Sequence, residues 1–455
     1  MRKQDKGSTH TIPSFANYLN KVFDFRSSIA SLSDARHEPD ISPQAVFLST
    51  FYGFVFRLPS FQQLEADLEN KYFQQWVGAD GPFSDDVLRY SLCSFDLAPL
   101  EQMLVRANRT LKRNKVFDEG RVQGRIVAAL DGIEVLSSYG RSCDHCLERR
   151  VKVTDAEGHT TEQLQYYHRL VGCQVVSSKV KPFLVVEWVR PGEGEDTAAL
   201  RLLARIPELY GSPFFDILLL DSLYAQAPVL KLADQVGWDL VITLKQEARD
   251  LYQNASHLFA SRPPNLHLSQ TEDGCGTEAD LWETEGLPFT QGHPQPVRVV
   301  HSEEKVTARH YRRRSLVAET TDHTWWWITT LAARTFPIQQ IWQLGHMRWR
   351  IENNGWNDLT QNWALKHDFL HACKHRPKSV TESGKRECVP NRGLPAVVLI
   401  LCVAFALGSS FTLLHSKLVR RYEISSLDVA RQLHHSLWQW QPPIRAPASG
   451  PAANS

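Results

Sequence analysis

The spacing of apolar residues divides the chain into stretches of different secondary structure. In residues 1–123 the apolar positions recur every three or four residues, which predicts a helical N-terminal region. After residue 124 they gather into continuous runs of strand length, such as 126–130 and 214–220. Because these runs alternate with helical stretches, residues 124–245 are expected to form a mixed α/β sheet covered by helices.

A polar segment then interrupts this pattern. Residues 246–324 are rich in Gly, Pro, Thr and Glu, and no helix of convincing length is predicted there. The segment is too long for one loop in a compact domain, so we expect a β-rich insertion with hairpin strands at 295–301 and 305–311. The strand-like run that begins at Trp325 returns the chain to the core, and 325–440 is expected to supply the rest of the main domain and C-terminal helices.

The chain ends, one apolar run and the cysteine content bear on the cellular setting. The N-terminus is polar and lacks the apolar segment of a signal peptide, and the tail 441–455 is expected to be disordered. The apolar run 394–407 is shorter than the roughly 20 residues that cross a bilayer, so it predicts a buried core helix and no membrane partner. Because 8 cysteines are few for a disulfide-stapled secreted fold, a reduced, cytoplasmic chain is expected.

The chain has almost no net charge, which bears on nucleic acid as a partner. Its 51 Lys and Arg residues face 50 Asp and Glu residues, so positive charge that attracts a polyanion must be arranged locally. A basic stripe of Arg106, Arg109 and Arg113 follows a helix predicted at 99–115. It is either a solvated helix face or a surface that contacts DNA phosphates. Further basic runs lie at 312–314 and 374–386.

Three acidic residues are candidates for catalysis. Asp131 and Asp221 each follow an apolar run, so both are expected beyond the carboxyl ends of parallel strands, where α/β sheets present their sites. If those strands are neighbours, the two carboxylates can share a metal ion, although isolated acids also cap helices and turns. Glu352 follows Arg348 by four residues, which places both on one face of a helix.

The motifs around these acids resemble a known family. They are Leu130-Asp131-Gly132, the phrase LLDSLYA around Asp221 and above all RWRIENNGW at 348–356. The chain resembles the DDE transposases of bacterial insertion sequences, most closely the insertion-sequence-four-like class, in which a β-rich insertion separates the second and third acids. The polar segment 246–324 lies in that interval. The resemblance, which covers about 126–371, implies a ribonuclease-H-like mixed sheet interrupted by the insertion.

The resemblance also implies a reaction. Asp131, Asp221 and Glu352 would be the catalytic acids and would bind Mg²⁺ or Mn²⁺, because hard carboxylate oxygens suit such ions. Two ions would promote phosphoryl transfer, first to water at the ends of the insertion sequence and then to target DNA. The expected partners are double-stranded DNA, as terminal inverted repeats and target, and a second copy of the chain in a homodimer. The alternatives are a ribonuclease-H-like nuclease without strand transfer and a catalytically inactive DNA-binding relic.

Basic residues around the third acid are expected to contact phosphate. They are Arg348, Arg350, His346 and Lys366. Two positions depart from the signature helix of the family: Gly345 replaces a common Tyr, and Leu359 replaces a common Lys. Either His346 and Lys366 take over phosphate contacts, or this copy has lost some activity.

Two further motifs have both a structural and a functional interpretation. Cys143 and Cys146 have the spacing of half a zinc site, and His168 with Cys173 could complete it, whereas reduced buried thiols are the simpler interpretation. In the run 325–327 three tryptophans alternate between the sides of a strand. This pattern favours core packing, and the alternative is stacking on an unpaired DNA base.

Overall fold

A computed structural model gives the structure of the chain, which divides into two units that are described separately. The first contains Met1–Ala107 and Asn362–Ser455, and the second contains Asn108–Gln361. The structure describes residues 11–154, 158–211, 213–245, 250–272, 275–290, 292–312, 315–371, 378–380, 386–388, 390–415 and 424–439. The tail at 441–455 and most of the basic run 374–386 lie outside these residues. Residues 362–440, expected with the catalytic sheet, belong instead to the unit of the N-terminal helices.

The first unit is helical, as the spacing of its apolar residues predicts. Some of its helices begin with hydroxyl caps: Ser42 accepts a hydrogen bond from the Ala45 N–H, and Ser60 accepts one from the Gln63 N–H. Its helices are α1 (Ile12–Phe23), α2 (Phe25–Ala30), α3 (Pro43–Val55), α4 (Phe61–Leu68), α5 (Lys71–Val77), α6 (Asp85–Leu92), α13 (Gly393–Ser410), which continues as η3 (Phe411–His415), and α15 (Ser426–Trp438). The short strands β11 (Lys378–Val380) and β12 (Arg386–Cys388) pair with each other, and α7 (Leu97–Arg113) crosses the sequence boundary between the units.

The apolar run 394–407 forms most of helix α13. With η3 it makes a helical segment, Gly393–His415, that is long and apolar enough to cross a membrane, with a mean hydropathy of 2.5 in its most apolar window. However, 78% of that window is buried inside the structure, and α13 packs against α3 and α6 of its own unit. The burial supports the interpretation as a core helix. In the same unit Cys93 is disulfide-bonded, so the expectation of a reduced chain is wrong for this cysteine.

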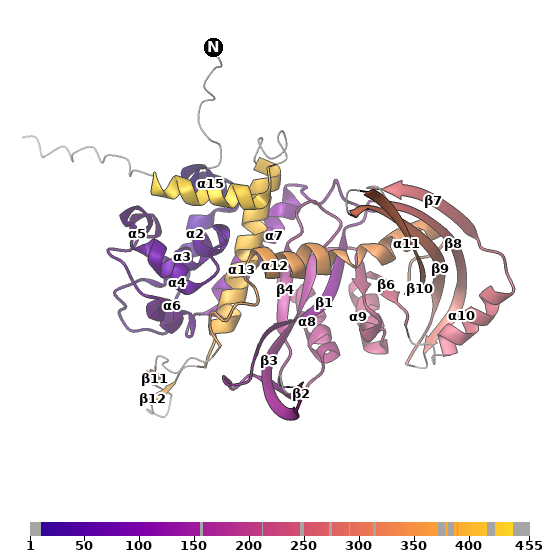
Figure 1. Ribbon diagram of the computed structural model, residues 1–455, viewed down its shortest axis with the longest axis horizontal. Helices are drawn as coiled ribbons and strands as arrows, with labels where there is room; N and C mark the ends of the chain where they lie inside the picture. Colours follow the sequence, from indigo (N-terminus) through magenta and orange to yellow (C-terminus); the bar gives the residue numbers. More distant parts are fainter. Residues whose placement is uncertain are drawn as a thin grey trace, which may run out of the picture. The chain divides into compact units, whose positions relative to one another are not determined.

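The second unit is built on one mixed sheet (Figure 1). Its strands are β1 (Val127–Ser138), β2 (Leu147–Thr154), β3 (Thr160–Val175), β4 (Phe183–Trp188), β5 (Ile217–Leu220), β6 (Asp239–Thr243), β7 (Leu266–Glu272), β8 (Cys275–Thr290), β9 (His293–Arg312) and β10 (Ser315–Thr329). Its helices are α8 (Glu195–Tyr210), η1 (Ser222–Tyr224), α9 (Ala227–Val236), α10 (Asp250–Ala260), α11 (Ile338–Met347), the π-helical turn η2 (Glu352–Trp356) and α12 (Asn357–Asn362). Helix α8 packs on β3 and β4, and α11 packs on β5, β6, β8 and β9.

The strand order of the sheet is that of a ribonuclease-H-like fold. Antiparallel β4, β3 and β1 are followed by β5 and β6, which run parallel to β1. Every residue of β5 is buried, because a parallel strand between two others is covered on both faces. The α/β fold class and the ribonuclease-H-like sheet predicted from the sequence are therefore confirmed.

The segment after β6 differs in detail from the prediction. It contains helix α10, although no convincing helix was expected there. The expected hairpin strands at 295–301 and 305–311 are parts of one continuous strand, β9. The long strands β10, β9, β8 and β7 extend the central sheet through antiparallel pairing of β10 with β6, and they curve strongly in Figure 1. The run from Trp325 is the end of β10, which begins at Ser315.

Candidate active site

Asp131 and Asp221 lie on neighbouring strands. The parallel pairing of β1 with β5 ends at Ala129 and Leu219, so each acid is two residues past that point. Asp221 directly follows β5 and begins the short helix η1. Asp131, in contrast, does not end its strand as expected, because β1 continues to Ser138 through antiparallel pairing with β3. The two carboxylates are therefore presented at the end of the parallel part of the sheet.

Gly132, the residue after the first acid, lies directly against the side chain of Glu195. A Cβ at this position would lie 2.4 Å from the carboxyl carbon of Glu195, the first residue of α8. The Glu195 carboxylate forms an ion pair with Arg169 on β3 and accepts a hydrogen bond of 2.6 Å from the Tyr224 hydroxyl. These partners hold a fourth acid beside Asp131, where its charge contributes to the raised pKa of Asp131.

Glu352 is positioned by the π-helical turn that it begins. Further along this turn, the Trp356 ring packs on the Phe183 ring of β4 at a centroid distance of 4.3 Å. A Cβ on Gly172 of β3 would lie 2.6 Å from the Trp356 ring, and one on Gly355 would lie 2.7 Å from a side-chain oxygen of Gln174. The motif Glu-Asn-Asn-Gly-Trp thus fixes the turn against the sheet. Such π-helical turns are frequent at functional sites.

The three acids interact electrostatically. Burial and then the negative charge of Glu352 raise the pKa of Asp131 to about 7. Burial raises the pKa of Glu352 as well, and Asp221 contributes, while the positive charge of Arg348 opposes this increase. Because neighbouring carboxylates help to raise the pKa values of Asp131 and Glu352, a bound cation at this site would lower the repulsion among the acids.

The oxygen atoms around Asp221 suit a divalent cation. Asp221 Oδ1 is buried and accepts no hydrogen bond, and its ionic partner is the Lys245 ammonium at 3.2 Å. The side chains of Asp221 and Glu352 are 29% and 35% exposed, so ligands can enter from solvent. Hard carboxylate oxygens with an accessible face fit Mg²⁺ or Mn²⁺, which keep positions for water and phosphate.

Arg348 is a buried cation at the edge of this site. Its side chain is 4% exposed, and Nη1 lies 3.7 Å from Glu352 Oε1, too far for a hydrogen bond. Its guanidinium carbon lies 4.2 Å from the centre of the Trp349 ring. The Nε and Nη1 atoms are buried without a hydrogen-bond partner among the described residues. A buried guanidinium with unused donors is suited to bind an anion such as a phosphate.

His346 makes a contact within the protein. Its Nε2 lies 3.0 Å from Glu304 Oε1 on β9, and Trp342 Nε1 donates to the same oxygen at 2.7 Å. All three residues line a cavity of about 470 Å³, whose wall also includes Arg350 and Met347. In the structure His346 pairs with this buried carboxylate, and its contact with phosphate stays a prediction.

The other predicted phosphate ligands are in varied settings. Arg350 is exposed and donates to the Val176 carbonyl at 3.3 Å. Burial lowers the pKa of Lys181, and the positive charge of Arg350 lowers it further. These two nearby cations are compatible with an anion ligand. Lys366 is exposed and belongs to the first unit, so its role remains a prediction.

The basic stripe on α7 has structural contacts. Arg109 donates to the Leu209 carbonyl near the end of α8 at 2.6 Å, and Lys112 donates to the Phe214 carbonyl at 2.8 Å. Arg113 reaches Thr110 Oγ1 at 3.5 Å, whereas Arg106 is exposed in the first unit. At least part of the stripe therefore caps free carbonyl groups, and phosphate binding by these residues remains a prediction.

Both departures from the family signature have a packing reason. A Cβ on Gly345 would lie 2.3 Å from the Trp327 ring, so that indole fills the space next to the helix. Leu359 is 1% exposed, which makes the position unsuitable for a lysine. In the tryptophan run, Trp326 and Trp327 are 8% and 1% exposed, as core packing predicts. Trp325 is half-buried and packs against Trp327 on the same side of β10.

Sequence reasoning did not find the groups that support the first two acids. The contributions of Glu195, Arg169, Tyr224 and Lys245 are visible only in the folded structure. All of them come from elements far from Asp131 along the chain, so no local motif joins them. Only the glycine after Asp131 gave a signal, because a Gly within a buried strand often marks a close approach.

Comparison with known proteins bears on this second unit. Residues 149–361 match the family described as the transposase DDE domain. The match includes Asp221 and Glu352 and begins after Asp131. No curated protein matches the chain. Among solved structures, a cryo-EM structure of a piggyBac transposase synaptic complex with hairpin DNA is 10% identical, with a TM-score of 0.38 over 92% of this chain and 77% of that chain, a likeness too low to support an argument.

Proposed function

Because residues 149–361 match the family described as the transposase DDE domain, we propose that the protein is a DNA transposase of the bacterial insertion-sequence kind. It cleaves the ends of its insertion sequence and joins them to target DNA by phosphoryl transfer. The observation that carries this proposal is the convergence of Asp131, Asp221 and Glu352 at one end of the parallel strands, next to the buried Arg348.

The three acids are proposed to hold two divalent cations, Mg²⁺ or Mn²⁺. When bound, such ions activate the attacking oxygen and stabilise the leaving oxygen of an in-line displacement. The buried oxygen of Asp221, whose ionic partner is Lys245, and the raised pKa values of Asp131 and Glu352 support this assignment. The protein contributes a fixed arrangement of ligands, since the sheet holds two acids and the anchored π-helical turn holds the third.

Arg348 is proposed to bind the phosphate of the scissile strand. Its two unused N–H donors would pair with a phosphate oxygen, and the Trp349 ring keeps the guanidinium plane in place. Glu195 is proposed as a positioning residue. It interacts with Arg169 and Tyr224 and lies against Gly132, so it limits the movement of β1 next to Asp131.

The partners of the reaction follow from the proposal. The substrates are double-stranded DNA, first the terminal inverted repeats and then the target. Two ends must be held together, so the active complex is proposed to be a homodimer in the cytoplasm. We propose that exposed basic residues contact DNA phosphates outside the acidic site; they are Arg350, Lys366 and the α7 residues Arg106, Arg109 and Arg113. His346 is proposed to contact phosphate as well.

The test is a cleavage and joining assay with the full chain and DNA that carries the ends of its element. We expect Mg²⁺- or Mn²⁺-dependent nicking at the ends, followed by joining of the 3′ end to a target plasmid. Glu352→Gln is expected to remove both activities, and the matched variant Glu303→Gln, at an exposed acid of the same unit, is expected to keep them. Nicking without joining would indicate a nuclease, and a wild-type protein that binds but never cuts DNA would indicate an inactive relic.

A further inference from the structure

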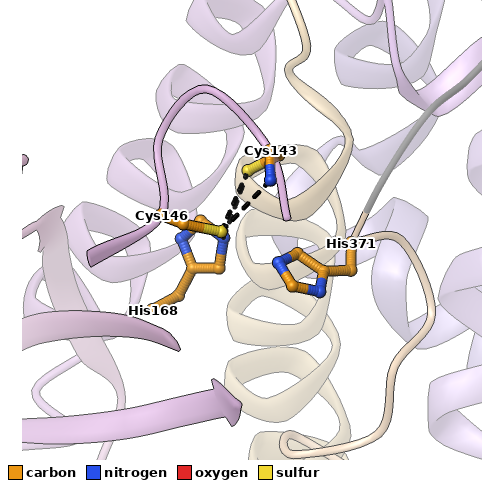
Figure 2. Close-up of side chains that lie close together, drawn as sticks. All are labelled: Cys143, Cys146, His168 and His371. Carbon is orange, nitrogen blue, oxygen red and sulfur yellow. Dashed lines mark hydrogen bonds between the residues drawn. The ribbon is translucent and has the colours of Figure 1, made fainter. Parts of the chain in front are cut away.

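A second cluster of metal-ligating side chains lies in the same unit and has no part in the proposed reaction. Cys143 and Cys146 lie in the loop between β1 and β2, and His168 lies on β3, where its backbone pairs with Leu136 of β1. The side chains of these three residues point toward one another in Figure 2. Figure 2 also draws His371, which belongs to the other unit and is given no ligand role.

The distances among the three ligand atoms are those of a tetrahedral site. The two sulfur atoms are 3.7 Å apart, and His168 Nε2 is 3.3 Å from Cys143 Sγ and 3.4 Å from Cys146 Sγ. Tetrahedral zinc with Zn–S bonds of about 2.3 Å and Zn–N bonds of about 2.0 Å has edges of roughly 3.8 Å between sulfurs and roughly 3.5 Å between sulfur and nitrogen. The cluster thus has the size that a single zinc ion requires.

The loop is arranged around the sulfur atoms. The Cys143 N–H donates to Cys146 Sγ at 3.2 Å, and the Cys146 N–H donates to the Cys143 carbonyl at 3.1 Å. The backbone of His145 is also hydrogen-bonded to the Cys143 sulfur. Amide donors directed at sulfur favour the thiolate, the form of cysteine that binds metals. Cys146 and His168 are buried, at 8% and 5% exposure, so their orientations are set by packing.

Hydrogen bonds alone account less well for this arrangement. The nitrogen His168 Nε2 has either one lone pair or one proton, yet both thiol groups lie at a similar distance from it. A disulfide is a second alternative, but Cys143 and Cys146 are free thiols, and 3.7 Å is far longer than an S–S bond of about 2.05 Å. Cys173, the other residue considered for this site, is buried on β3 and is not part of the group that a metal could hold.

We propose that Cys143, Cys146 and His168 bind one structural zinc ion that fastens the β1–β2 loop to β3. Two thiolates and an imidazole suit zinc and not Mg²⁺, so the ion is distinct from those proposed at the carboxylates. The ion would fix the outer end of the β1–β3 pair, whose inner part carries Asp131. This inference rests on its own residues and does not depend on the proposed transposase activity.

The test is the metal content of the full chain, expressed in zinc-supplemented medium and purified without a polyhistidine tag or chelator. We expect about one zinc per chain by mass spectrometry of the elements. Cys143→Ser, Cys146→Ser and His168→Gln should reduce the content to background, whereas Cys275→Ser, a half-buried free cysteine of the same unit, should leave it unchanged. Wild-type protein without metal but with free thiols or a Cys143–Cys146 disulfide would overturn the proposal.

A second measurement keeps the test decisive if the variants fold poorly. Wild-type protein reloaded with Co²⁺ should show the intense visible bands of tetrahedral cobalt and a thiolate-to-metal charge-transfer band. One equivalent of zinc per chain should displace the cobalt and abolish these bands. Bands typical of octahedral cobalt without thiolate charge transfer would contradict a site made of two cysteines and one histidine.

Discussion

The two polar clusters of the second unit differ in ligand chemistry and in how the chain builds them. Asp131, Asp221 and Glu352 are carboxylates from three separated segments, and two of them are partly open to solvent. Cys143, Cys146 and His168 are sulfur and nitrogen ligands on adjacent elements, and most of their surface is buried. The open carboxylates suit ions that exchange water and phosphate, and the buried thiols suit an ion that stays.

This difference separates function from stability within one sheet. In the carboxylate site the mutual repulsion of the acids destabilises the metal-free fold, and a cation removes that cost. In the thiol site the ion connects a loop to a strand, so its loss would loosen the fold.

Selective metal removal should separate the two clusters most clearly. Omitting Mg²⁺ and Mn²⁺ is expected to abolish DNA nicking and to lower the melting temperature by less than zinc removal does, because only the repulsion among the acids is restored. Stripping zinc with a strong thiol-competing chelator is expected to lower the melting temperature by on the order of 5 °C or more. Nicking assays and thermal scans on the same samples check both effects. A melting temperature that does not respond to zinc removal would contradict the structural role of the thiol cluster.

Substitution of the acids should reduce activity without loss of fold. Asp131→Asn and Asp221→Asn are expected to lower the nicking rate by about 10³-fold or more, because each removes a charged metal ligand. Circular dichroism should remain that of wild type, and Glu303→Gln serves as the control. Nicking at near wild-type rates in either variant would remove that residue from the catalytic site.

Arg348 should show a smaller effect that depends on the shape of its side chain. Arg348→Ala is expected to lower the nicking rate by about 10²-fold, since the phosphate loses a charge-assisted donor. Arg348→Lys is expected to recover only part of the activity, because an ammonium does not reproduce the planar fork that stacks on Trp349. Rates at saturating Mg²⁺ check this prediction, and full recovery by Lys would show that charge alone matters.

The smallest effect concerns stability and pH in the absence of divalent ions. The pKa of Asp131 in the folded protein is about 7, above its ordinary value of 3.8, so the fold favours the protonated form. Stability should therefore decrease as the pH rises between these values. Asp131→Asn is expected to raise the free energy of unfolding by about 1–3 kcal/mol at about pH 8, and the gain should vanish below about pH 4. Denaturant titrations with a chelator present measure it, and a pH-independent difference would rule out repulsion as the cause.

The core of the fold could be predicted from the sequence, and Asp221 and Glu352 could be placed beside it, because these elements have local signatures. A buried parallel strand such as β5 is a continuous apolar run, and Asp221 follows it directly. The motif around Glu352 is specific because Gly355 and Trp356 must fit closely against the sheet. Such signals depend on neighbours within a few residues.

Other features could not be predicted because their causes are distant in sequence. Strand β9 buries polar residues such as Arg298, Ser302 and Glu304, so it lacks the continuous apolar run that marks a buried strand and is predicted as two pieces. The contact of Glu195 with Gly132 depends on how α8 packs on the sheet. Gly345 of helix α11 takes the place of a Tyr because the Trp327 ring of strand β10 fills the adjacent space.

The most direct test of the central claim is anomalous diffraction from crystals of the full chain soaked with Mn²⁺. The account predicts manganese peaks bound by the carboxylates of Asp131, Asp221 and Glu352, at the distances of about 2.0–2.6 Å that are usual for oxygen ligands. A separate peak at the zinc edge is expected beside Cys143. Manganese that binds elsewhere, with these three carboxylates free of metal in crystals that remain intact, would contradict the account.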